Sequence, residues 1–269
     1  MTRNTSQSIS GHSISGHSLL ELSGVGKHFG GLAALSGVSL HIRQGEIYGL
    51  IGPNGAGKTT LFNILTGLYQ LDSGSFTFAG SSYTRCKPHL LAQAGIARTF
   101  QNIRLFANMT ALENIMVGRH LRTHTGLWGA LTRNAAARAE ERAMTERAHE
   151  LLRYVSINRP SNTLAKNLSY GEQRRLEIAR ALATDPKLLA LDEPAAGMNA
   201  TETASLKSLL QTIRASGITI LLIEHDVKLI MNLCDRIAVL NYGEKIAEGQ
   251  PEEIRNNPAV ITAYLGSAT

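Results

Sequence analysis

The pattern of apolar and polar positions in the first quarter of the chain predicts a short buried strand followed by a helix. Residues 47–51 form an apolar run, and apolar residues recur at helical spacing over 61–65 until Gly67. The segment between them, residues 52–59, reads Gly-Pro-Asn-Gly-Ala-Gly-Lys-Thr. The pattern therefore predicts a strand, a glycine-rich loop and a helix in direct succession.

The pattern changes character twice along the rest of the chain. Short β-like runs separated by glycine predict strands at 19–22, 35–42, 46–51 and 75–78. Residues from about 102 to 184 have a helical pattern, which includes an Ala-, Arg- and Glu-rich helix at 135–155. From residue 187 onward, strands and helices alternate, at 188–191, 201–216, 218–223, 227–234 and 236–240. This order predicts an α/β fold with a parallel sheet covered by helices, beside an antiparallel β piece.

Residues 1–18 differ from the rest and predict a flexible tail. They are rich in Ser, Gly and His, and Ser-Ile-Ser-Gly-His occurs twice in succession. Such a composition cannot bury enough apolar surface to fold. His12 and His17 could bind a metal, but a solvated linker is the simpler interpretation. We expect one folded domain over 19–269, with a helical subdomain at about 102–184.

Composition narrows the classes of function. The 269 residues carry a net charge of +6, which favours acidic partners or a membrane surface. Only 5% of residues are aromatic, and no basic stretch is interleaved with aromatics, so we expect no nucleic-acid partner. Eight arginines and four glutamates lie between 119 and 159. This segment is either a solvated helix face or a surface that docks beneath a membrane.

Cysteines and apolar runs give no sign of export or of a membrane span. Cys86 and Cys234 belong to no C-x-x-C pair, so we expect reduced thiols and neither a disulfide framework nor a zinc site. The longest apolar runs, such as 218–223, are too short to cross a bilayer, and the N-terminus lacks the apolar core of a signal peptide. We therefore expect a protein inside the cell, attached to a membrane through a partner.

The glycine loop has the residue types that bind phosphate. Glycines at 52, 55 and 57 remove side chains, so successive N–H groups can converge on phosphate oxygens at a helix start. Lys58 is expected to reach the β- and γ-phosphates of a nucleotide, and the Thr59 hydroxyl to ligate Mg²⁺. The structural alternative is a glycine-rich turn that caps a helix, with Lys58 as a solvated charge. The complete pattern and both flanks favour the phosphate site.

Two acidic residues follow the predicted strand at 188–191. Asp192 and Glu193 precede Pro194, at the carboxyl end of the strand, where open α/β sheets bind ligands. Asp192 suits the Mg²⁺ shell, and Glu193 suits the orientation or deprotonation of the water that attacks a γ-phosphate. Alone, the motif is better explained by a strand that ends in a polar turn. Beside a phosphate loop, the catalytic interpretation is favoured.

Ser169 and Glu172 have the spacing of a capping box at the start of another predicted helix, which explains the pair without any ligand. With the phosphate loop upstream and the acidic pair downstream, however, residues 168–173 (Leu-Ser-Tyr-Gly-Glu-Gln) resemble the signature sequence of ATP-binding cassette proteins. The resemblance covers nearly everything after residue 18. It implies a P-loop NTPase (RecA-like) core with a parallel sheet, an antiparallel β subdomain and a helical subdomain.

The resemblance implies roles for three residues outside these motifs. Phe29 matches the aromatic residue that stacks on adenine, although a core aromatic fits the sequence equally well. Gln101 matches the glutamine that touches Mg²⁺ and couples to the transporter. His225 matches the histidine that contacts the γ-phosphate, where sequence alone indicates a structural histidine. The implied catalytic set is therefore Glu193, His225 and Gln101.

The resemblance also implies the nucleotide and metal contacts. The nucleotide is contacted by Phe29, Gly52, Pro53, Asn54, Gly55, Ala56, Gly57, Lys58, Thr59 and Thr60, and Mg²⁺ by Thr59, Gln101 and Asp192. Ser169 and Gly171 are implied to contact ATP held by the opposite subunit, a role that suits a helix N-terminus. ATP is then expected to join two nucleotide-binding domains.

Two residues depart from the usual family pattern. Tyr170 stands where many members have glycine, and Asn199 stands where aspartate is usual. Residues 199–202 also make a good helix start, so capping is a sufficient explanation for Asn199. Neither departure removes a Mg²⁺ ligand or the proposed base.

Within the family, the chain is most similar to the ATP-binding subunits of Liv-type branched-chain amino-acid importers. The stretches that carry this similarity are 98–101, 104–106, 167–171, 174–180, 193–197 and 257–266, with a long helical insert after Gly118. Such systems combine two ATPase chains, two membrane permeases and a periplasmic binding protein. The similarity implies a peripheral subunit at the cytoplasmic face of the inner membrane, in a homodimer or beside a sister ATPase.

The expected function is therefore Mg²⁺-dependent ATP hydrolysis that drives import of branched-chain or related amino acids. Alternatives inside the family are a urea or amide importer and a lipopolysaccharide extractor. A cassette protein that acts on the ribosome or DNA is disfavoured, because the chain has neither two cassettes nor long coiled coils. A phosphate-loop GTPase is disfavoured by the absence of an N-K-x-D motif. No residue here is expected to touch the transported solute, because specificity lies in the binding protein and the permeases.

Overall fold

A six-stranded sheet forms the centre of the computed structural model, which describes residues 17–84, 87–122 and 135–265. The strand order is β10-β9-β3-β8-β7-β6. All neighbouring pairs are parallel except β10 with β9, which is antiparallel. The strands are β3 (Ile47–Ile51), β6 (Ile96–Arg98), β7 (Leu188–Asp192), β8 (Thr219–Ile223), β9 (Arg236–Asn241) and β10 (Glu244–Gly249).

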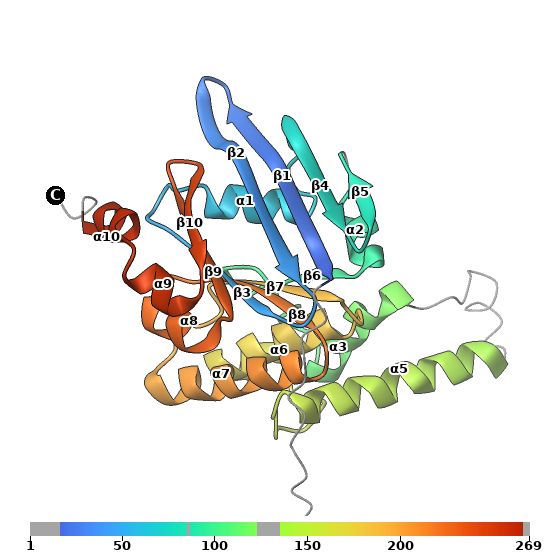
Figure 1. Ribbon diagram of the computed structural model, residues 1–269. Helices are drawn as coiled ribbons and strands as arrows, with labels where there is room; N and C mark the ends of the chain where they lie inside the picture. The colour runs from blue at the N-terminus through green and yellow to red at the C-terminus, as the bar shows by residue number, and fades with distance from the viewer. Residues whose placement is uncertain (1–16, 85–86, 123–134, 266–269) are drawn as a thin grey trace, which may run out of the picture.

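A second sheet is antiparallel, with the order β2-β1-β4-β5. Its strands are β1 (Ser18–Phe29), β2 (Leu32–Arg43), β4 (Ser73–Phe78) and β5 (Ser81–Tyr83). In Figure 1 this sheet stands above the six-stranded sheet, and α1 lies against it. Exposed and buried positions alternate along the second half of β2, as expected for a sheet with one face on the core.

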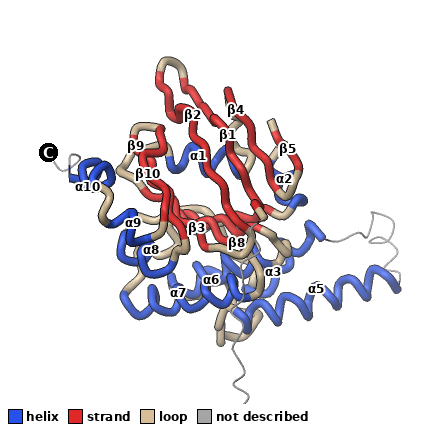
Figure 2. The backbone as a smooth tube through the Cα atoms, viewed as in Figure 1, coloured by secondary structure: helices blue, strands red, loops and turns tan. Residues whose placement is uncertain are grey.

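Most helices lie on the other side of the six-stranded sheet, and the tube view in Figure 2 separates this helical layer from the strands. The helices are α1 (Lys58–Leu65), α2 (Pro88–Ala94), α3 (Ala111–Arg119), α5 (Ala135–Tyr154), α6 (Tyr170–Leu182), α7 (Ala200–Ala215), α8 (Val227–Leu233), α9 (Pro251–Arg255) and α10 (Pro258–Leu265). Two 3₁₀ turns, η1 (His120–Arg122) and η2 (Ala165–Asn167), complete the described elements.

Strand β3 contributes to two cores, because successive side chains of a strand point to opposite faces. Ile47 and Ile51 pack in a cluster with residues of α3, α5, α6, α7 and α8. Tyr48 and Leu50 pack in a cluster with α1 and the antiparallel sheet. The phosphate loop therefore leaves a strand that is buried on both faces, which holds its first residue in place.

Capping boxes start α6 and α7, as their sequences predict. Ser169 Oγ accepts a hydrogen bond from the Glu172 backbone N–H over 3.3 Å. Asn199 Oδ1 accepts from the Glu202 N–H over 3.0 Å. Replacement of such a cap by alanine costs about 1 kcal/mol. Asn199 thus has a structural role whatever else it does.

The predicted α/β architecture, with a parallel sheet, an antiparallel sheet and helices, is confirmed. The expected strand at 19–22 is wrong in length, because β1 continues to Phe29 through its pairing with β2. Register shifts along this pair break the alternation that would have revealed the longer strand. The short elements α2 and β6 were not predicted, because a few residues hold too little of a period.

Several sequence-based expectations fall outside the described residues. The predicted tail at 1–18 does so except for its last two residues, and Ser18 already belongs to β1. His12 and Cys86 lie outside as well. Cys234 is a free thiol, and burial raises its pKa well above the usual range. The division into a tail, one domain and a helical subdomain stays a prediction.

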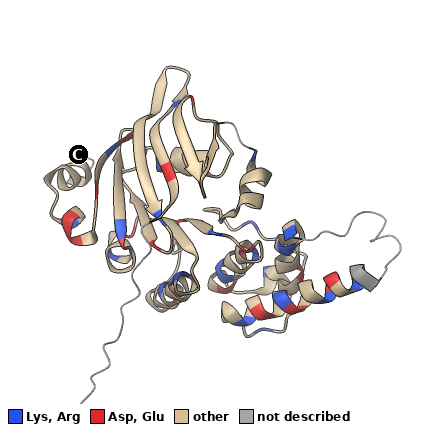
Figure 3. Ribbon diagram, turned by 45° about the vertical axis from the view of Figure 1, so that its right-hand side comes forward, with Lys and Arg blue, Asp and Glu red and all other residues tan. Residues whose placement is uncertain are grey.

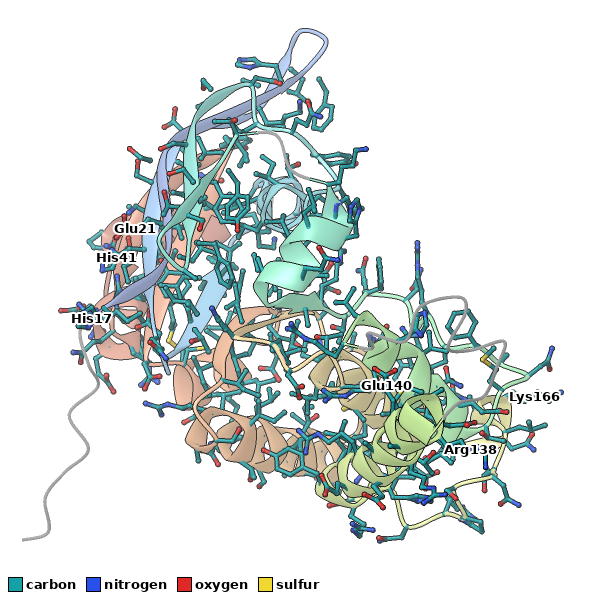
Figure 4. The ribbon with its side chains drawn as sticks, turned by 90° about the vertical axis from the view of Figure 1, so that its right-hand side faces the viewer. His17, Glu21, His41, Arg138, Glu140 and Lys166 are labelled. Atoms are coloured by element: carbon teal, nitrogen blue, oxygen red, sulfur yellow. The ribbon has the colours of Figure 1, made fainter. Side chains whose placement is uncertain are left out.

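Part of the arginine-rich segment at 119–159 forms α5, along which basic and acidic residues are interspersed in Figure 3. Arg147 pairs with Glu150 over 3.0 Å and with Asp185 over 3.6 Å. Figure 4 shows Arg138 and Glu140 on the same helix. These contacts support the solvated-face interpretation, and docking beneath a membrane stays a prediction. None of the helices in the described part of the chain is both long enough and apolar enough to span a bilayer.

Candidate active site

The predicted phosphate loop joins β3 to α1 and passes close to neighbouring backbone. Gly57 has a φ of 99°, and a Cβ there would lie 2.7 Å from the carbonyl oxygen of Ala34. Gly52 has a φ of 152°, and a Cβ there would lie 2.1 Å from the carbonyl oxygen of Leu240. Only glycine fits at both positions without a shift of the backbone. The loop can therefore turn tightly into the start of α1.

Lys58, the first residue of α1, is buried and points back into the loop. Its Nζ donates hydrogen bonds to the carbonyl oxygens of Gly52 over 2.7 Å and Pro53 over 2.9 Å. Burial lowers the pKa of Lys58, and the carboxylates of Glu193 and Asp192 act in the opposite direction. The loop thus fixes an ammonium group at the point where several backbone N–H groups begin a helix, which suits a phosphate ligand.

A cavity of about 540 Å³ opens over this loop. Its wall combines the loop with residues from distant parts of the chain: Phe29, Leu32, Ala33, Ala34, Asn54, Gly55, Ala56, Gly57, Lys58, Thr59, Thr60, Gln101, Glu193, His225, Tyr242 and Gly243. Phe29 is 44% exposed, and its ring meets that of Tyr69 edge-on at a centroid distance of 5.2 Å. An exposed ring at a cavity rim is available for stacking, so the alternative of a core aromatic is wrong.

Glu193 follows β7 and is held between two side chains from other elements. His225 Nε2 lies 2.6 Å from Glu193 Oε1, and Gln101 Nε2 donates to Glu193 Oε2 over 2.9 Å. The Glu193 backbone has a φ of 48°, in the left-handed region that non-glycine residues seldom adopt. Unusual backbone geometry is concentrated at functional sites. The structure therefore brings the three expected catalytic side chains together at one edge of the cavity.

Two buried carboxylates support this arrangement. Glu224 accepts hydrogen bonds from the Ala195 N–H over 2.8 Å and the His225 N–H over 3.2 Å, and burial raises its pKa. Sequence reasoning missed this role, although Glu224 directly precedes His225. Burial, and then the Glu193 carboxylate, raise the pKa of Asp192. A cation brought beside Asp192 would relieve that effect.

The described residues that could hold Mg²⁺ fit this ion. Thr59 and Gln101 line the cavity, and Asp192 lies at the carboxyl end of β7 beside Glu193. They offer a hydroxyl, an amide and a carboxylate oxygen, which are hard ligands of the kind that Mg²⁺ prefers. Within the described ranges, no group of three or more His, Cys, Asp or Glu residues could hold a metal alone. Such a sparse set suits an ion that is completed by nucleotide phosphates.

Ser169 and Gly171 do not line this cavity. Ser169 is occupied by its capping box, with its N–H and Oγ each 2.9 Å from Glu172 Oε2. Gly171 is buried, and a Cβ there would lie 2.8 Å from Glu202 Oε1. Tyr170 is 45% exposed, and its hydroxyl accepts a hydrogen bond from Arg174 over 3.3 Å. Within one chain, the helix tip is thus separate from the loop site.

A glycine loop between a buried parallel strand and a helix, with a buried lysine and a strand-end pair of acids, defines a P-loop nucleotide-binding protein. Comparison with known families narrows this class. The family model for ABC transporters matches residues 35–196, and the model for branched-chain amino acid ATP-binding cassette transporters matches residues 244–269. The chain belongs to the ABC transporter family, as its motifs predict.

Individual relatives agree with this assignment. The chain is 47% identical to the high-affinity branched-chain amino acid transport ATP-binding protein BraF of Pseudomonas aeruginosa, over 93% of this chain and 98% of BraF. It is 46% identical to LivG of Escherichia coli K12, with the same coverage of each chain. Among solved structures, the ADP conformation of MJ1267, an ATP-binding cassette of an ABC transporter, is 33% identical. It matches with a TM-score of 0.82, over 93% of this chain and 99% of MJ1267.

Proposed function

We propose that this chain is the ATP-hydrolysing subunit of an importer for branched-chain amino acids. The observation that carries the proposal is the cavity in which Lys58, Gln101, Glu193 and His225 converge above the phosphate loop. This set supplies a cation for the phosphates and a carboxylate for the attacking water, which phosphoryl transfer to water requires. The similarity to BraF and LivG supports the solute class.

ATP is bound with its phosphates at the start of α1 and its adenine at the rim formed by Phe29 and Tyr242. Lys58 exchanges its hydrogen bonds to the loop carbonyl oxygens for hydrogen bonds to the β- and γ-phosphates. The buried ammonium then lies beside negatively charged oxygens, which form stronger hydrogen bonds with it. Thr59, Gln101 and Asp192 would hold Mg²⁺, which would neutralise the charge that develops on the transferred phosphoryl group.

Glu193 acts as the base or orienting group for the attacking water. Both of its carboxylate oxygens are engaged in the structure, one by His225 and one by Gln101. Each carboxylate oxygen keeps a second lone pair, which can accept a hydrogen bond from a water next to the γ-phosphate. The Glu224 carboxylate fixes the backbone of His225, so this histidine is a well-positioned donor for the γ-phosphate.

The second half of the site comes from another cassette. Ser169 and Gly171 lie at the N-terminal tip of α6, where Ser169 is exposed and Gly171 is buried, and neither lines the cavity of its own chain. A composite site gives both helix tips a phosphate ligand, so ATP joins two cassettes and hydrolysis releases them. Two transmembrane permeases convert this closure into alternating access, and a periplasmic binding protein delivers the amino acid. The cassettes then lie at the cytoplasmic face of the membrane.

The test uses the complete transporter in proteoliposomes, with ATP inside and the leucine-loaded binding protein outside. Wild-type chain is expected to show Mg²⁺-dependent ATP hydrolysis and uptake of labelled leucine. Glu193→Gln is expected to lose steady-state hydrolysis and to form a longer-lived ATP-bound dimer, visible by size-exclusion chromatography. Unchanged hydrolysis in Glu193→Gln would refute the assigned mechanism.

The solute class is tested separately in the same vesicles. Binding proteins loaded with leucine, urea or an amide are compared for the stimulation of ATP hydrolysis, and lipopolysaccharide release is assayed in parallel. Stimulation by leucine alone is the expected result. Stimulation by urea or an amide, or lipopolysaccharide release, would leave the ATPase assignment intact and overturn the solute assignment.

A further inference from the structure

Arg174, on the second turn of α6, is the largest fully buried side chain in the described part of the molecule. Its guanidinium points toward the loop that follows β6. Nη1 donates to the Phe100 carbonyl oxygen over 2.7 Å, and Nη2 donates to the Gln101 carbonyl oxygen over 2.8 Å. Arginine suits this task, because its rigid fork can hold two acceptors at a fixed separation.

Glu177, one turn further along α6, binds the same loop through its N–H groups. The carboxylate is 1% exposed and lies 3.1 Å from Arg174 Nη1. Its Oε1 accepts hydrogen bonds from the Phe100 N–H over 3.4 Å and the Arg104 N–H over 3.3 Å. The buried pair therefore binds both donors and acceptors of the loop backbone, which neutral side chains of similar size could not do.

The opposite end of this loop is attached to the phosphate-loop helix. The Arg98 guanidinium lies 4.7 Å from the Phe62 ring centroid and 4.4 Å from that of Phe100. It also donates to Asn63 Oδ1 over 3.1 Å and to Thr66 Oγ1 over 2.7 Å, both at α1. The loop is thus bound to α1 on one side of Phe100 and to α6 on the other.

We propose that Arg174 and Glu177 are positioning residues that hold the Gln101 loop on α6, so that Gln101 and the Ser169 tip move as one unit. The inference rests on the proposed function, because it assigns the pair a part in ATP hydrolysis. Gln101 is one of the two side chains that bind Glu193. When a partner's nucleotide binds at the Ser169 end of α6, the displacement of this end is therefore transmitted through five residues of helix to the backbone of Gln101.

A rigid connection is physically reasonable at this place. Breaking one partner out of a buried ion pair leaves the other charge unpaired, so the pair resists opening. The loop cannot leave α6 without also breaking the four backbone contacts to Arg174 and Glu177. Bending between the two helices is then concentrated at the Arg98 side of Phe100. A misplacement of Gln101 by about 1 Å is enough to reduce turnover by up to about 10²-fold.

The test replaces both charges together, as Arg174→Met/Glu177→Leu, in the full chain. Replacing both members avoids leaving one buried charge unpaired, and the four loop backbone groups that lose these partners are expected to detach from α6. Three measurements are made: the Kd for ATP by titration, kcat for hydrolysis in the assembled transporter, and hydrogen exchange of the 100–104 amides. We expect kcat to fall about tenfold or more, Kd to change less than about twofold, and exchange at 100–104 to accelerate at least about tenfold.

Arg180→Met is the matched control, because Arg180 is a partly buried arginine of the same helix whose guanidinium faces the Phe106 ring instead. It is expected to leave kcat and the 100–104 exchange unchanged. Arg174→Lys is the second variant: it keeps the charge but not the fork, and is expected to lower kcat with little change in Tm.

The proposal is overturned if the paired variant keeps either wild-type kcat or wild-type exchange at 100–104. It is also overturned if Arg180→Met lowers kcat as much as the paired variant does. Failure of the wild-type chain to hydrolyse ATP would refute the proposed function instead. The exchange measurement needs no turnover, so it separates the two cases.

Discussion

The N-termini of α1 and α6 are both suited to bind phosphate, but they are prepared in opposite ways. Helix α1 starts at Gly57 without any side-chain cap, inside the cavity and next to the buried Lys58. Helix α6 starts at Ser169 with a complete capping box and lies outside that cavity. Free N–H groups at an uncapped helix start are ready for an anion, whereas capped ones are already satisfied. In the proposed function, the start of α1 is therefore the finished phosphate site, and the tip of α6 is a reserve site where a ligand must compete with the cap.

The largest expected effect comes from removal of the charge at the finished site. Lys58→Ala is expected to weaken ATP binding by about 10²-fold, because a buried charge-assisted contact to the phosphates is lost. Isothermal titration of the isolated chain measures this directly. Lys166→Ala, at a surface lysine that donates to Asn108 over 3.0 Å, is the matched control. Equal ATP affinity in Lys58→Ala and wild type would show that the cavity is not the nucleotide site.

Ser169→Asp tests the reserve site with a capping residue retained. Aspartate caps a helix as well as serine does, but its carboxylate would lie against Glu172 Oε2, which accepts from Ser169 Oγ over 2.9 Å, so Tm is expected to fall by about 2–4 °C. Its carboxylate would oppose the γ-phosphate of a partner's nucleotide, so steady-state hydrolysis is expected to fall about tenfold or more. ATP affinity of the isolated chain should not change, because Ser169 lies outside the cavity.

Ser169→Ala separates the loss of the cap from the added charge. It removes the cap at a cost of about 1 kcal/mol, so Tm is expected to fall, and it adds no charge that would oppose a phosphate. If Ser169→Asp hydrolysed ATP at the wild-type rate in the assembled complex, the two helix starts would not share a nucleotide.

The raised pKa of Asp192, on the α1 side of the site, predicts that the Tm of an Asp192 variant will differ from that of wild type by an amount that depends on pH. Burial, and then Glu193, raise its pKa, so ionised Asp192 destabilises the nucleotide-free fold. This cost is present above the raised pKa and disappears below the pKa of the unfolded chain. Asp192→Asn is expected to raise Tm at neutral pH by about 2–4 °C, the shift that about 1 kcal/mol produces in a domain of this size. The gain should vanish toward pH 4.

Differential scanning calorimetry from pH 8 to pH 4 measures this gain. Asp72→Asn is the opposite-sign control, because the hydrogen bond from Lys27 lowers the pKa of Asp72. It should bring no increase in Tm at neutral pH. A gain for Asp192→Asn that is equal at pH 8 and pH 4 would contradict the electrostatic explanation.

Glu172→Gln is expected to have the smallest effect and to sharpen the contrast between the helix starts. Glutamine keeps the capping geometry with Ser169 but removes a negative charge from the tip of α6. An incoming phosphate then meets less repulsion, so the KM for ATP of the assembled complex is expected to fall about two- to fivefold. Glu113→Gln, in the capping box of α3, is the matched control and should leave KM unchanged. A higher KM in Glu172→Gln would mean that the tip does not receive an anion.

Local sequence was sufficient for the α1 side of the site. The strand, the glycines and Lys58 are contiguous, so their spacing alone specifies a strand, a loop and a helix start. Local sequence was insufficient for Glu224 and Arg174, because their contacts are with residues far away in the chain. Glu224 contacts Ala195, and Arg174 contacts Phe100 and Gln101. In the sequence, Glu224 is an acid after an apolar run, and Arg174 is one of two adjacent arginines.

The sequence by itself determined the phosphate loop, the strand-end acids, the capped starts of α6 and α7, and the alternation of strands and helices after residue 187, because each depends on neighbours within a few residues. Only the tertiary structure decided that Gln101 and His225 meet at Glu193, that Arg174 is buried against the Gln101 loop, and that Ser169 does not line its own chain's cavity. Those facts follow from how the two sheets and the helical layer pack. Packing contacts join residues that are far apart in the sequence, so a pattern over a few neighbouring residues does not predict them.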